Sequence, residues 1–400
     1  MYRILATSTD PRLLELPWHI PLADWPAELL VALPHGISRH VVRFIRVGDE
    51  VLAAKEMPVE AASHEYRMLQ DLVRLKLPTV EPVGVVTDRY CANGEALGAI
   101  LLTRHLHFSL PYQALFGRGI QAETVTKLLD AMVVLLVRLH LGGFMWGDVS
   151  LSNVLFLRDA GQFAAYLVDA ETGELHDVLS DGQRAADQDI AIVNVFGGFC
   201  DLEAAGHLDA SVDPMQVSEY VAERYLALWD ELTCEQELGN DELSRIETRV
   251  RRLGELGFDV AELAVTTSPD GTRITVQPKV VDAGHHARRL MRLTGLDTQE
   301  NQARRLLNDM DAYRAITNQW GVDESIVAQC WLREQFLPAL AVIPPELSHK
   351  LDPAQLYHEI LDYRWFQAER EHRAVPIQEA AVGYVCDVLS HLPDEEVTAG

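Results

Sequence analysis

The sequence has 400 residues, 48% of them hydrophobic and 24% charged, which is typical of a folded globular protein with two or three domains. Its formal net charge of −26 argues against a nucleic-acid-binding protein and against docking on an anionic membrane, because both require basic surface. We expect no transmembrane segment and no signal peptide, because neither apolar pattern is present. Five scattered cysteines without a C-x-x-C pair indicate reduced thiols and hence a cytoplasmic protein.

The first third of the chain predicts a short lead-in followed by a strand-rich segment. Residues 1–30 are rich in Pro and Leu with little periodicity, and we expect them to pack on the next domain. Residues 31–57 alternate between apolar and polar, which predicts three short strands with turns at 34–36 and 48–49. One helix, with apolar residues at helical spacing, and two further strands should follow. Their expected positions are 59–75 for the helix, and 80–88 and 96–106 for the strands.

The rest of the chain is predicted to be mainly helical. Apolar residues recur three and four apart over 125–139, and Gly142-Gly143 ends this helix. A hairpin-like pair of strands should come next, and then helices from about 183 to 250. A second hairpin is expected within 261–280, around a Pro-Asp-Gly turn. Helices then continue, with breaks at Gly295, Gly321 and Pro344-Pro345.

Four short motifs follow one another on these predicted elements. VLAAKEM places Lys55 on a strand, and SHEYRML places Glu65 ten residues later on the next helix. WGDVSLSN places Asp148 and Asn153 five residues apart, directly after the long helix, and LVDAET places Asp169 at the end of a strand. Each motif alone is weak, because such residues usually face solvent and Gly-Asp pairs are common in turns. Their order on the expected elements makes the set specific.

Together the four motifs resemble the protein-kinase-like superfamily. The resemblance implies an α+β, two-lobed fold with a small antiparallel-sheet lobe and a mainly helical large lobe. A mostly helical C-terminal domain of unknown function, carrying a β-hairpin, should follow. The expected domains are a lead-in at 1–30, a small lobe at 31–110, a large lobe at 111–238 and a C-terminal α/β domain at 239–400.

The resemblance also implies a role for each motif residue. Lys55 would hold the nucleotide phosphates, and Glu65 would pair with that lysine. Asp148 would be the general base, or the acid that orients the acceptor hydroxyl, as in the loop H-R-D-x-x-x-x-N. Asn153 and Asp169 would bind Mg²⁺, which prefers oxygen ligands. The implied cofactors are therefore ATP and Mg²⁺.

Departures from the superfamily pattern narrow the resemblance to one group. Trp146-Gly147 replaces the His-Arg pair that precedes the catalytic acid, so no arginine is available to receive an activation-loop phosphate. The metal-binding triplet is Asp169-Ala170-Glu171, which resembles aminoglycoside, choline and lipopolysaccharide kinases. Glu171 is either a second metal ligand or a surface acid. The best resemblance is to the lipopolysaccharide kinases, over about residues 30 to 235.

Two further segments carry expectations about the same site. The loop that should cover the phosphates is poor in glycine. It offers only Gly36 and Ser38 for cofactor binding instead of the pattern G-x-G-x-x-G. The helix soon after the metal-binding triplet resembles the one that follows the kinase catalytic core, and Asp189, or alternatively Asp187, should be the acid that braces the catalytic loop. The interval before that helix is too short for a peptide-docking activation segment. The acceptor should therefore be an unidentified small molecule or a glycan-like compound.

Other functions remain open on the sequence. One is a catalytically silent nucleotide-binding module that acts on a protein partner through the C-terminal domain. In another, the C-terminal domain carries out the protein's function.

Residues 284–305 contain five arginines against two acids, a local charge of +3. This stretch is either an anion-binding face or a helix docked by ion pairs on the acidic first domain. His285 and His286 are adjacent, so on a helix they should not share one metal ion.

Overall fold

The computed structural model divides the chain into two compact units. It describes residues 2–7, 10–33, 39–116, 122–233, 236–239, 258–267 and 273–392. The first unit comprises residues 1–157, 165–227 and the last two residues, and the second comprises residues 158–164 and 228–398. The second unit is therefore discontinuous in sequence, since it includes a short segment from the middle of the first.

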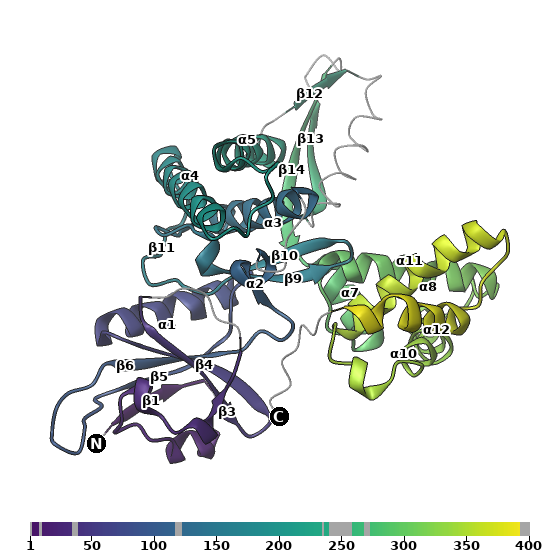
Figure 1. The fold of residues 1–400 in the computed structure, drawn as a ribbon. Coiled ribbons are helices and arrows are strands. Elements are labelled where there is room, and N and C mark those ends of the chain that lie inside the picture. Colours follow the sequence, from purple (N-terminus) through teal and green to yellow (C-terminus); the bar gives the residue numbers. More distant parts are fainter. Residues whose placement is uncertain are drawn as a thin grey trace. The chain divides into compact units, whose positions relative to one another are not determined.

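The small lobe of the first unit is built on a six-stranded antiparallel sheet with the strand order β1-β5-β6-β4-β3-β2 (Figure 1). Helix α1 packs on β5 and β6. Gly48, with φ of +64°, and Asp49 form the two-residue turn between β3 and β4, as the sequence predicts. The elements are β1 Arg3–Ala6, β2 Leu30–Val31, β3 Val41–Val47, β4 Glu50–Met57, α1 Val59–Arg74, β5 Pro82–Thr87 and β6 Ala99–Arg104.

The first thirty residues are more than a lead-in, because they supply an edge strand and part of the small-lobe core. Strand β1 pairs with β5, and three short 3₁₀ helices follow it. Trp18 and Trp25 are buried beside the sheet with their rings edge to face. The buried guanidinium of Arg89 fixes this segment by donating to the carbonyl oxygens of Trp18 at 3.0 Å and Ile20 at 2.6 Å. The 3₁₀ helices are η1 Pro11–Glu15, η2 Leu22–Asp24 and η3 Ala27–Leu29.

The large lobe is mainly helical, with short strands that carry the polar motifs. Helix α3 is buried over much of its surface, which explains its dense apolar pattern, and it packs on β8. Ser180 and Gln183 form a capping box that starts α4. The elements are β7 Leu110–Pro111, α2 Tyr112–Phe116, α3 Ala122–Leu141, β8 Phe144–Met145, η4 Leu151–Asn153, β9 Val154–Asp159, β10 Gln162–Leu167, β11 Glu174–Leu175, α4 Asp181–Ala204 and α5 Pro214–Thr233.

The prediction of helix from 183 to 250 is wrong at residues 236–239, and residues 234–235 and 240–250 lie outside the described ones. Residues Gln236–Gly239 form strand β12, which pairs with β14 Arg273–Ala283. That pairing joins segments far apart in the sequence, so local periodicity does not reveal it. The predicted second hairpin is confirmed as β13 Phe258–Thr267 and β14, although its Pro-Asp-Gly turn lies outside the described residues.

From residue 285 to residue 391 the second unit is mainly helical. Its core gathers large aromatic side chains, among them Trp331 and Tyr357, whose ring centroids lie 5.6 Å apart. The predicted break at Gly295 is confirmed, because this residue ends α7 with a φ of +79° that favours glycine. The elements are α7 His285–Thr294, α8 Glu300–Ile316, α9 Glu324–Trp331, the π-helical turn η5 Leu332–Phe336, α10 Leu337–Leu340, η6 Pro345–Leu347, α11 Pro353–Glu371, α12 Ile377–Asp387 and η7 Leu389–His391.

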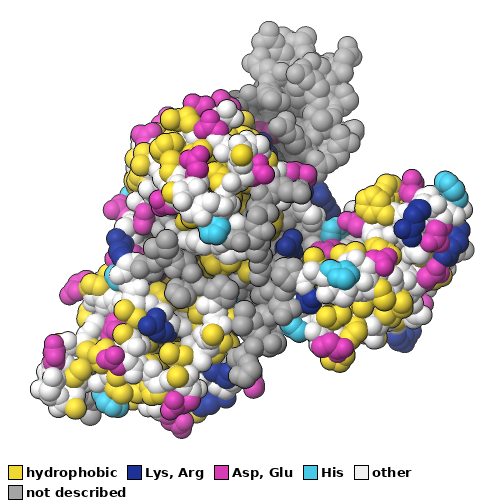
Figure 2. Space-filling model, in the orientation of Figure 1, with side chains coloured by type: hydrophobic (Ala, Val, Ile, Leu, Met, Phe, Trp, Pro, Cys, Tyr) yellow, Lys and Arg dark blue, Asp and Glu magenta, His cyan; other side chains and the backbone are white. Residues whose placement is uncertain are grey.

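Arginines of the basic stretch 284–305 form ion pairs inside the second unit. Arg289 pairs with Glu324 on α9, and Arg305 pairs with Asp362 on α11 at 2.9 Å. Figure 2 shows basic and acidic side chains interspersed over the C-terminal helices. These pairs partly neutralise the stretch, which favours a structural role for the two arginines over an anion-binding one.

The segment 158–164, at the tip of the β9–β10 hairpin, joins the second unit through buried hydrogen bonds. Asp159 is buried and accepts from the backbone N–H of Gln302 at 2.8 Å and from Asn301 Nδ2 at 2.9 Å, in the first turn of α8. Gln302 Nε2 donates to the carbonyl oxygen of Arg158 at 3.0 Å, and Ala160 N–H donates to Gln355 Oε1 at 3.1 Å. A residue distant in sequence thus helps to cap α8.

The contribution of Asp159 to the stability of the second unit should fall as the pH rises from about 4 to 6, because Asp159 becomes ionised while buried. Burial raises the pKa of Asp159 from 3.8 to about 6, and its hydrogen bonds offset only part of the increase. The folded chain therefore binds this proton more tightly than the unfolded chain, and the cost, about 3 kcal/mol, is complete above pH 6.

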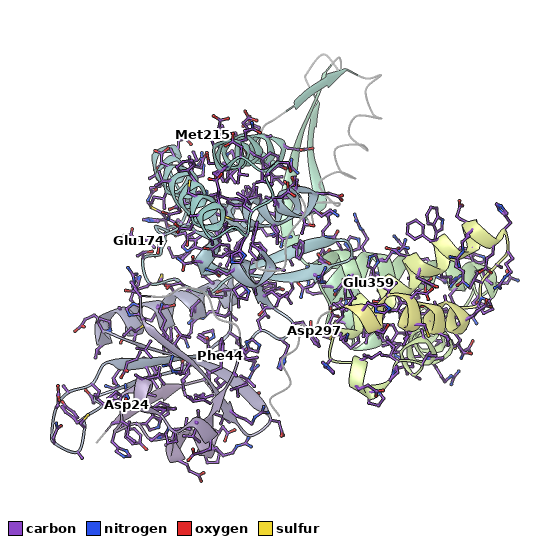
Figure 3. The ribbon with its side chains drawn as sticks, in the orientation of Figure 1. Asp24, Phe44, Glu174, Met215, Asp297 and Glu359 are labelled. Carbon is purple, nitrogen blue, oxygen red and sulfur yellow. The ribbon has the colours of Figure 1, made fainter. Side chains whose placement is uncertain are left out.

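Urea unfolding at pH 4.5 and 7 measures this effect. Asp159→Asn should lose the Asp159-dependent part of the pH slope, whereas Asp297→Asn, at an exposed position labelled in Figure 3, should keep the parental slope. Identical slopes for the parent and Asp159→Asn would contradict the assignment.

Candidate active site

Lys55 stands at the centre of an ion-pair cluster in the first unit. Its strand β4 is hydrogen-bonded on both sides, to β3 and to β6. Lys55 Nζ lies 2.9 Å from Glu65 Oε2 and 2.8 Å from Asp169 Oδ2. The predicted pairing of Lys55 with Glu65 is therefore present in the structure, with Asp169 at the same ammonium group.

Glu65 reaches this cluster because it lies on the apolar face of α1. The helix buries Ala62, Tyr66, Leu69 and Leu72 at helical spacing, and Glu65 falls on the same stripe. Its carboxylate is fully buried, and burial together with the charge of Asp169 raises its pKa to about 7 despite the opposing effect of Lys55. A charged residue at a core position of a helix requires a partner, which the lysine provides.

One ammonium group faces more than one carboxylate in this cluster. Burial disfavours the charged form of Lys55, but the carboxylates of Glu65 and Asp169 outweigh it and raise the pKa of Lys55. The two carboxylates repel each other, which contributes to the raised pKa of Glu65. The carboxylates of Glu65 and Asp169 are thus held together by a lysine that stays charged. The cluster keeps an excess of negative charge. Such an excess suits a further cation.

The segment WGDVSLSN forms a loop whose polar side chains are tied to one another. Asn153 Nδ2 donates to the backbone oxygen of Asp148 at 3.0 Å and to its Oδ2 at 3.1 Å. Asn194, on α4, donates through Nδ2 to the carbonyl oxygen of Val149 at 3.0 Å. The backbone N–H of Val168 donates to the carbonyl oxygen of Asn153 at 3.1 Å, which links the starts of β9 and of the segment after β10. Asp148, Asn153 and Asp169 therefore belong to one small region.

Asp187 braces this loop, so the preference for Asp189 is wrong and the alternative, Asp187, is confirmed. It is buried, and its two oxygens accept from the backbone N–H groups of Trp146 at 2.6 Å and Gly147 at 2.8 Å. His140 Nε2 lies 3.1 Å from the same carboxylate. Asp189 is exposed instead. The helix periodicity of α4, which buries Asp187 with the residues one, two and three turns later, explains why Asp187 faces inward.

Gly147 occupies a position where a side chain would not fit. Its φ of +76° lies in the left-handed region, and a Cβ there would stand 2.9 Å from the carbonyl oxygen of Thr172. Thr172 Oγ1 in turn donates to the carbonyl oxygen of Trp146 at 2.9 Å. The Gly-Asp pair is therefore a turn at which Trp146 and Gly147 lie close to Thr172.

A cleft with a cavity volume of about 130 Å³ adjoins the cluster. One part of its lining is apolar, from residues such as Val42, Phe44 (labelled in Figure 3) and Leu101. Its polar lining includes Lys55, Glu65, Asn153 and Asp169.

His105 also lines this cleft, where its ring meets Phe44 edge to face. Burial, assisted by nearby His107, lowers the pKa of His105 to about 4, so the ring is neutral at physiological pH. The cleft therefore offers a neutral, partly aromatic wall.

Carboxylate oxygens of Glu65, Asp169 and Glu171 lie within 4.8 Å of one another, which could allow them to hold a metal ion. Oxygen donors of this kind suit Mg²⁺, so the residues present fit that ion. The sequence predicts Asn153 rather than Glu65 as a metal ligand. In the structure Glu65 faces Lys55, and Asn153 Nδ2 faces Asp148. Gly36 and Ser38, predicted for cofactor binding, lie outside the described residues.

Sequence reasoning missed four side chains around the site. Asn194 and His140 support the loop that carries Asp148, and the available signal was a polar residue on a buried helix face. Arg39 and His40, just before β3, contact Glu171 through its Oε2 at 3.2 and 2.9 Å. No motif marks these two residues, because the contact joins segments more than 130 residues apart.

The chain has a protein-kinase-like fold: a small antiparallel-sheet lobe carrying Lys55, followed by a mainly helical lobe carrying Asp148 and Asp169. Within that class it resembles the lipopolysaccharide kinases, since residues 44–194 match the Lipopolysaccharide kinase (Kdo/WaaP) family. Residues 227–389 match the Domain of unknown function (DUF4032).

A solved structure, "WaaP in complex with acyl carrier protein", is similar at 14% identity, with 64% of this chain and 99% of that chain covered and a TM-score of 0.36. Comparison with curated proteins gives no match. Among the described helices, none combines the length and the apolar stretch that crossing a bilayer requires.

Proposed function

We propose that this protein is an ATP- and Mg²⁺-dependent phosphotransferase that transfers a phosphoryl group to a hydroxyl of a small-molecule or glycan-like acceptor. The observation that carries the proposal is the placement of Lys55 between Glu65 and Asp169, at 2.9 and 2.8 Å, in a cleft that Asn153 also lines. Phosphoryl transfer asks a protein mainly for positioning and charge, which such a cluster supplies.

Each residue of the site has a role in this proposal. Lys55 neutralises phosphate oxygens, and Glu65 holds the lysine in place. Asp169, with Asn153 or Glu171, would bind Mg²⁺, which when bound offsets charge on the transferred phosphoryl group. Asp148 accepts or orients the proton of the attacking hydroxyl. Asp187 and Asn194 act indirectly, by fixing the loop that carries Asp148.

The cleft supports a nucleotide as the phosphoryl donor. A nucleobase would pack against the apolar part lined by Val42, Leu101 and Leu155, while the phosphates would meet Lys55 at the polar part. Only about ten residues separate Asp169 from the start of α4 at Asp181, which leaves no room for a long peptide-docking segment. This short interval favours a small acceptor over a protein substrate.

The compartment and the C-terminal domain belong to the same proposal. Cys91, Cys200, Cys330 and Cys386 are free thiols, which supports a reducing compartment such as the cytoplasm. The C-terminal domain would bind a protein partner or the acceptor.

Nucleotide binding tests the proposal directly. In a thermal-shift series with ATP, ADP and GTP, ATP with Mg²⁺ at a hundredfold excess over its dissociation constant should raise stability by about 2.7 kcal/mol, because only the folded chain binds it. Asp169→Asn should remove the Mg²⁺-dependent part of this increase. Asp201→Asn, the same charge change at an exposed site on α4, should leave it intact.

Three outcomes separate the candidate functions. Mg²⁺-dependent binding with turnover of an acceptor supports the phosphotransferase. Binding without turnover on a broad acceptor panel points to a nucleotide-binding regulatory module. No stabilisation by any nucleotide would reject both functions, and identical binding with EDTA present would reject the metal role of Asp169.

A further inference from the structure

A single carboxylate oxygen, Glu171 Oε2, is surrounded by nitrogen atoms from three side chains. His40 Nε2 lies at 2.9 Å, Arg39 Nη2 at 3.2 Å and Lys55 Nζ at 3.8 Å. The side chains of His40, Lys55 and Glu171 are at most 16% exposed, whereas Arg39 is 58% exposed. Such convergence of nitrogen donors on one oxygen is the arrangement that a phosphate oxygen requires.

Lys55 and His40 reach the same oxygen from the sheet and from the bend before β3. Val42 on β3 pairs with Lys55 on β4, so their side chains share one face of the sheet. Val42 and Lys55 both line the cleft. His40 lies in the bend just before β3, and its Nε2 reaches the same region by its 2.9 Å contact with Glu171 Oε2.

We propose that Arg39 and His40 bind the polyphosphate of the nucleotide together with Lys55, and that Glu171 occupies the phosphate position while no nucleotide is bound. The proposal rests on the proposed function and assigns its phosphate grip to two side chains. In the superfamily that task falls to the backbone of a glycine-rich loop. This chain has a single glycine, Gly36, between β2 and β3, so cationic side chains can take over the role.

The exchange of Glu171 for phosphate follows from charge. A triphosphate presents several anionic oxygens to Arg39 and His40, whereas Glu171 presents one carboxylate, so a bound nucleotide competes effectively for the same donors. The displaced Glu171 remains two residues from Asp169, and its oxygen already lies within 4.8 Å of those of Asp169 and Glu65. Glu171 would therefore move from the cations of the small lobe to the metal ion that arrives with the nucleotide.

Isothermal titration with ATP, ADP, AMP, adenosine and inorganic tripolyphosphate tests the phosphate grip. Arg39→Gln should weaken binding of ATP and tripolyphosphate about 3- to 10-fold, as expected for a partly exposed charge-assisted contact, and should leave adenosine binding unchanged. His40→Leu should act in the same direction. Arg46→Gln is the matched control, because Arg46 is an exposed arginine on the same lobe, at β3.

Glu171→Gln provides a test of opposite sign. In EDTA this variant should bind ATP about 3-fold more tightly than the parent, because a competing internal anion has been removed. In Mg²⁺ it should gain less affinity from the metal than the parent does. A melting temperature for each variant shows that the change is not a loss of fold.

The outcomes separate this inference from the proposed function. Two results would overturn the assignment of Arg39 and His40 to phosphate binding: equal ATP affinity for Arg39→Gln and Arg46→Gln, or weaker metal-free binding by Glu171→Gln. Nucleotide binding by the parent would still support the kinase-like function in either case. If the parent binds tripolyphosphate but no nucleotide, and Arg39→Gln loses that binding, the anion site stands and the phosphotransferase falls.

Discussion

Replacing Asp148 by alanine should lower the turnover of phosphoryl transfer by about 10²- to 10⁴-fold, the usual contribution of a positioned acid–base group. The reason is geometric: Asn153 Nδ2 holds the Asp148 carboxylate at 3.1 Å, and Asn194 fixes the next residue of the loop. ATP affinity should change little, because Asp148 is not among the described residues that line the cleft beside Lys55.

Parallel measurements of turnover, ATP affinity and melting temperature distinguish this role from a purely structural one. If Asp148 only supports a turn, its loss should lower the melting temperature, and the remaining activity should follow the folded fraction. Asp201→Ala, on the same lobe, serves as the control for removing one acid. If the Asp148→Ala variant folds normally and turns over like the parent, the proposal that this protein is an enzyme loses its basis.

Replacing Asp187 by alanine should destabilise the first unit by about 3–5 kcal/mol, because it leaves buried donors without their acceptor. The two backbone N–H groups of Trp146 and Gly147 and the ring of His140 all converge on this carboxylate. Asp187→Asn keeps one acceptor oxygen and should cost less.

Equilibrium unfolding in urea measures this loss, with Asp189→Ala as the matched control. Asp189 lies two residues away on the same helix but is exposed, so its removal should change stability by no more than about 0.5 kcal/mol. Equal effects of the two substitutions would show that the brace contributes little to the fold.

Spacing along the chain predicted the parts of the site that depend on local structure. Lys55 and Glu65 lie ten residues apart across one strand-to-helix connection, and Asp148 and Asn153 lie five residues apart in one loop. These short separations are enough to predict that each pair is close in space. A charged residue on an apolar helix face, as at Glu65, was itself a signal that a partner existed.

Contacts between distant segments could not be predicted in the same way. Arg89 binds the carbonyl oxygens of residues about 70 positions earlier, and His40 meets Glu171 across 131 positions. Strand β12 lies in a stretch that was predicted as helix. It pairs with β14, a distant segment, and its own residues do not reveal that pairing. Periodicity reports which face of an element is buried, and it carries no information on which other element covers that face.

The hairpin tip that belongs to the second unit has a consequence for biosynthesis. Asp159 leaves the ribosome 142 residues before Asn301, with which it shares a hydrogen bond in the finished protein. Chains are made at about 5–20 residues per second and their domains tend to fold as units, so the nascent kinase-like half must wait several seconds for the α8 helix that buries this carboxylate. A gene cut between the two family matches would separate the segment from its helix in both products. The two halves are therefore expected to be inherited and expressed as one chain.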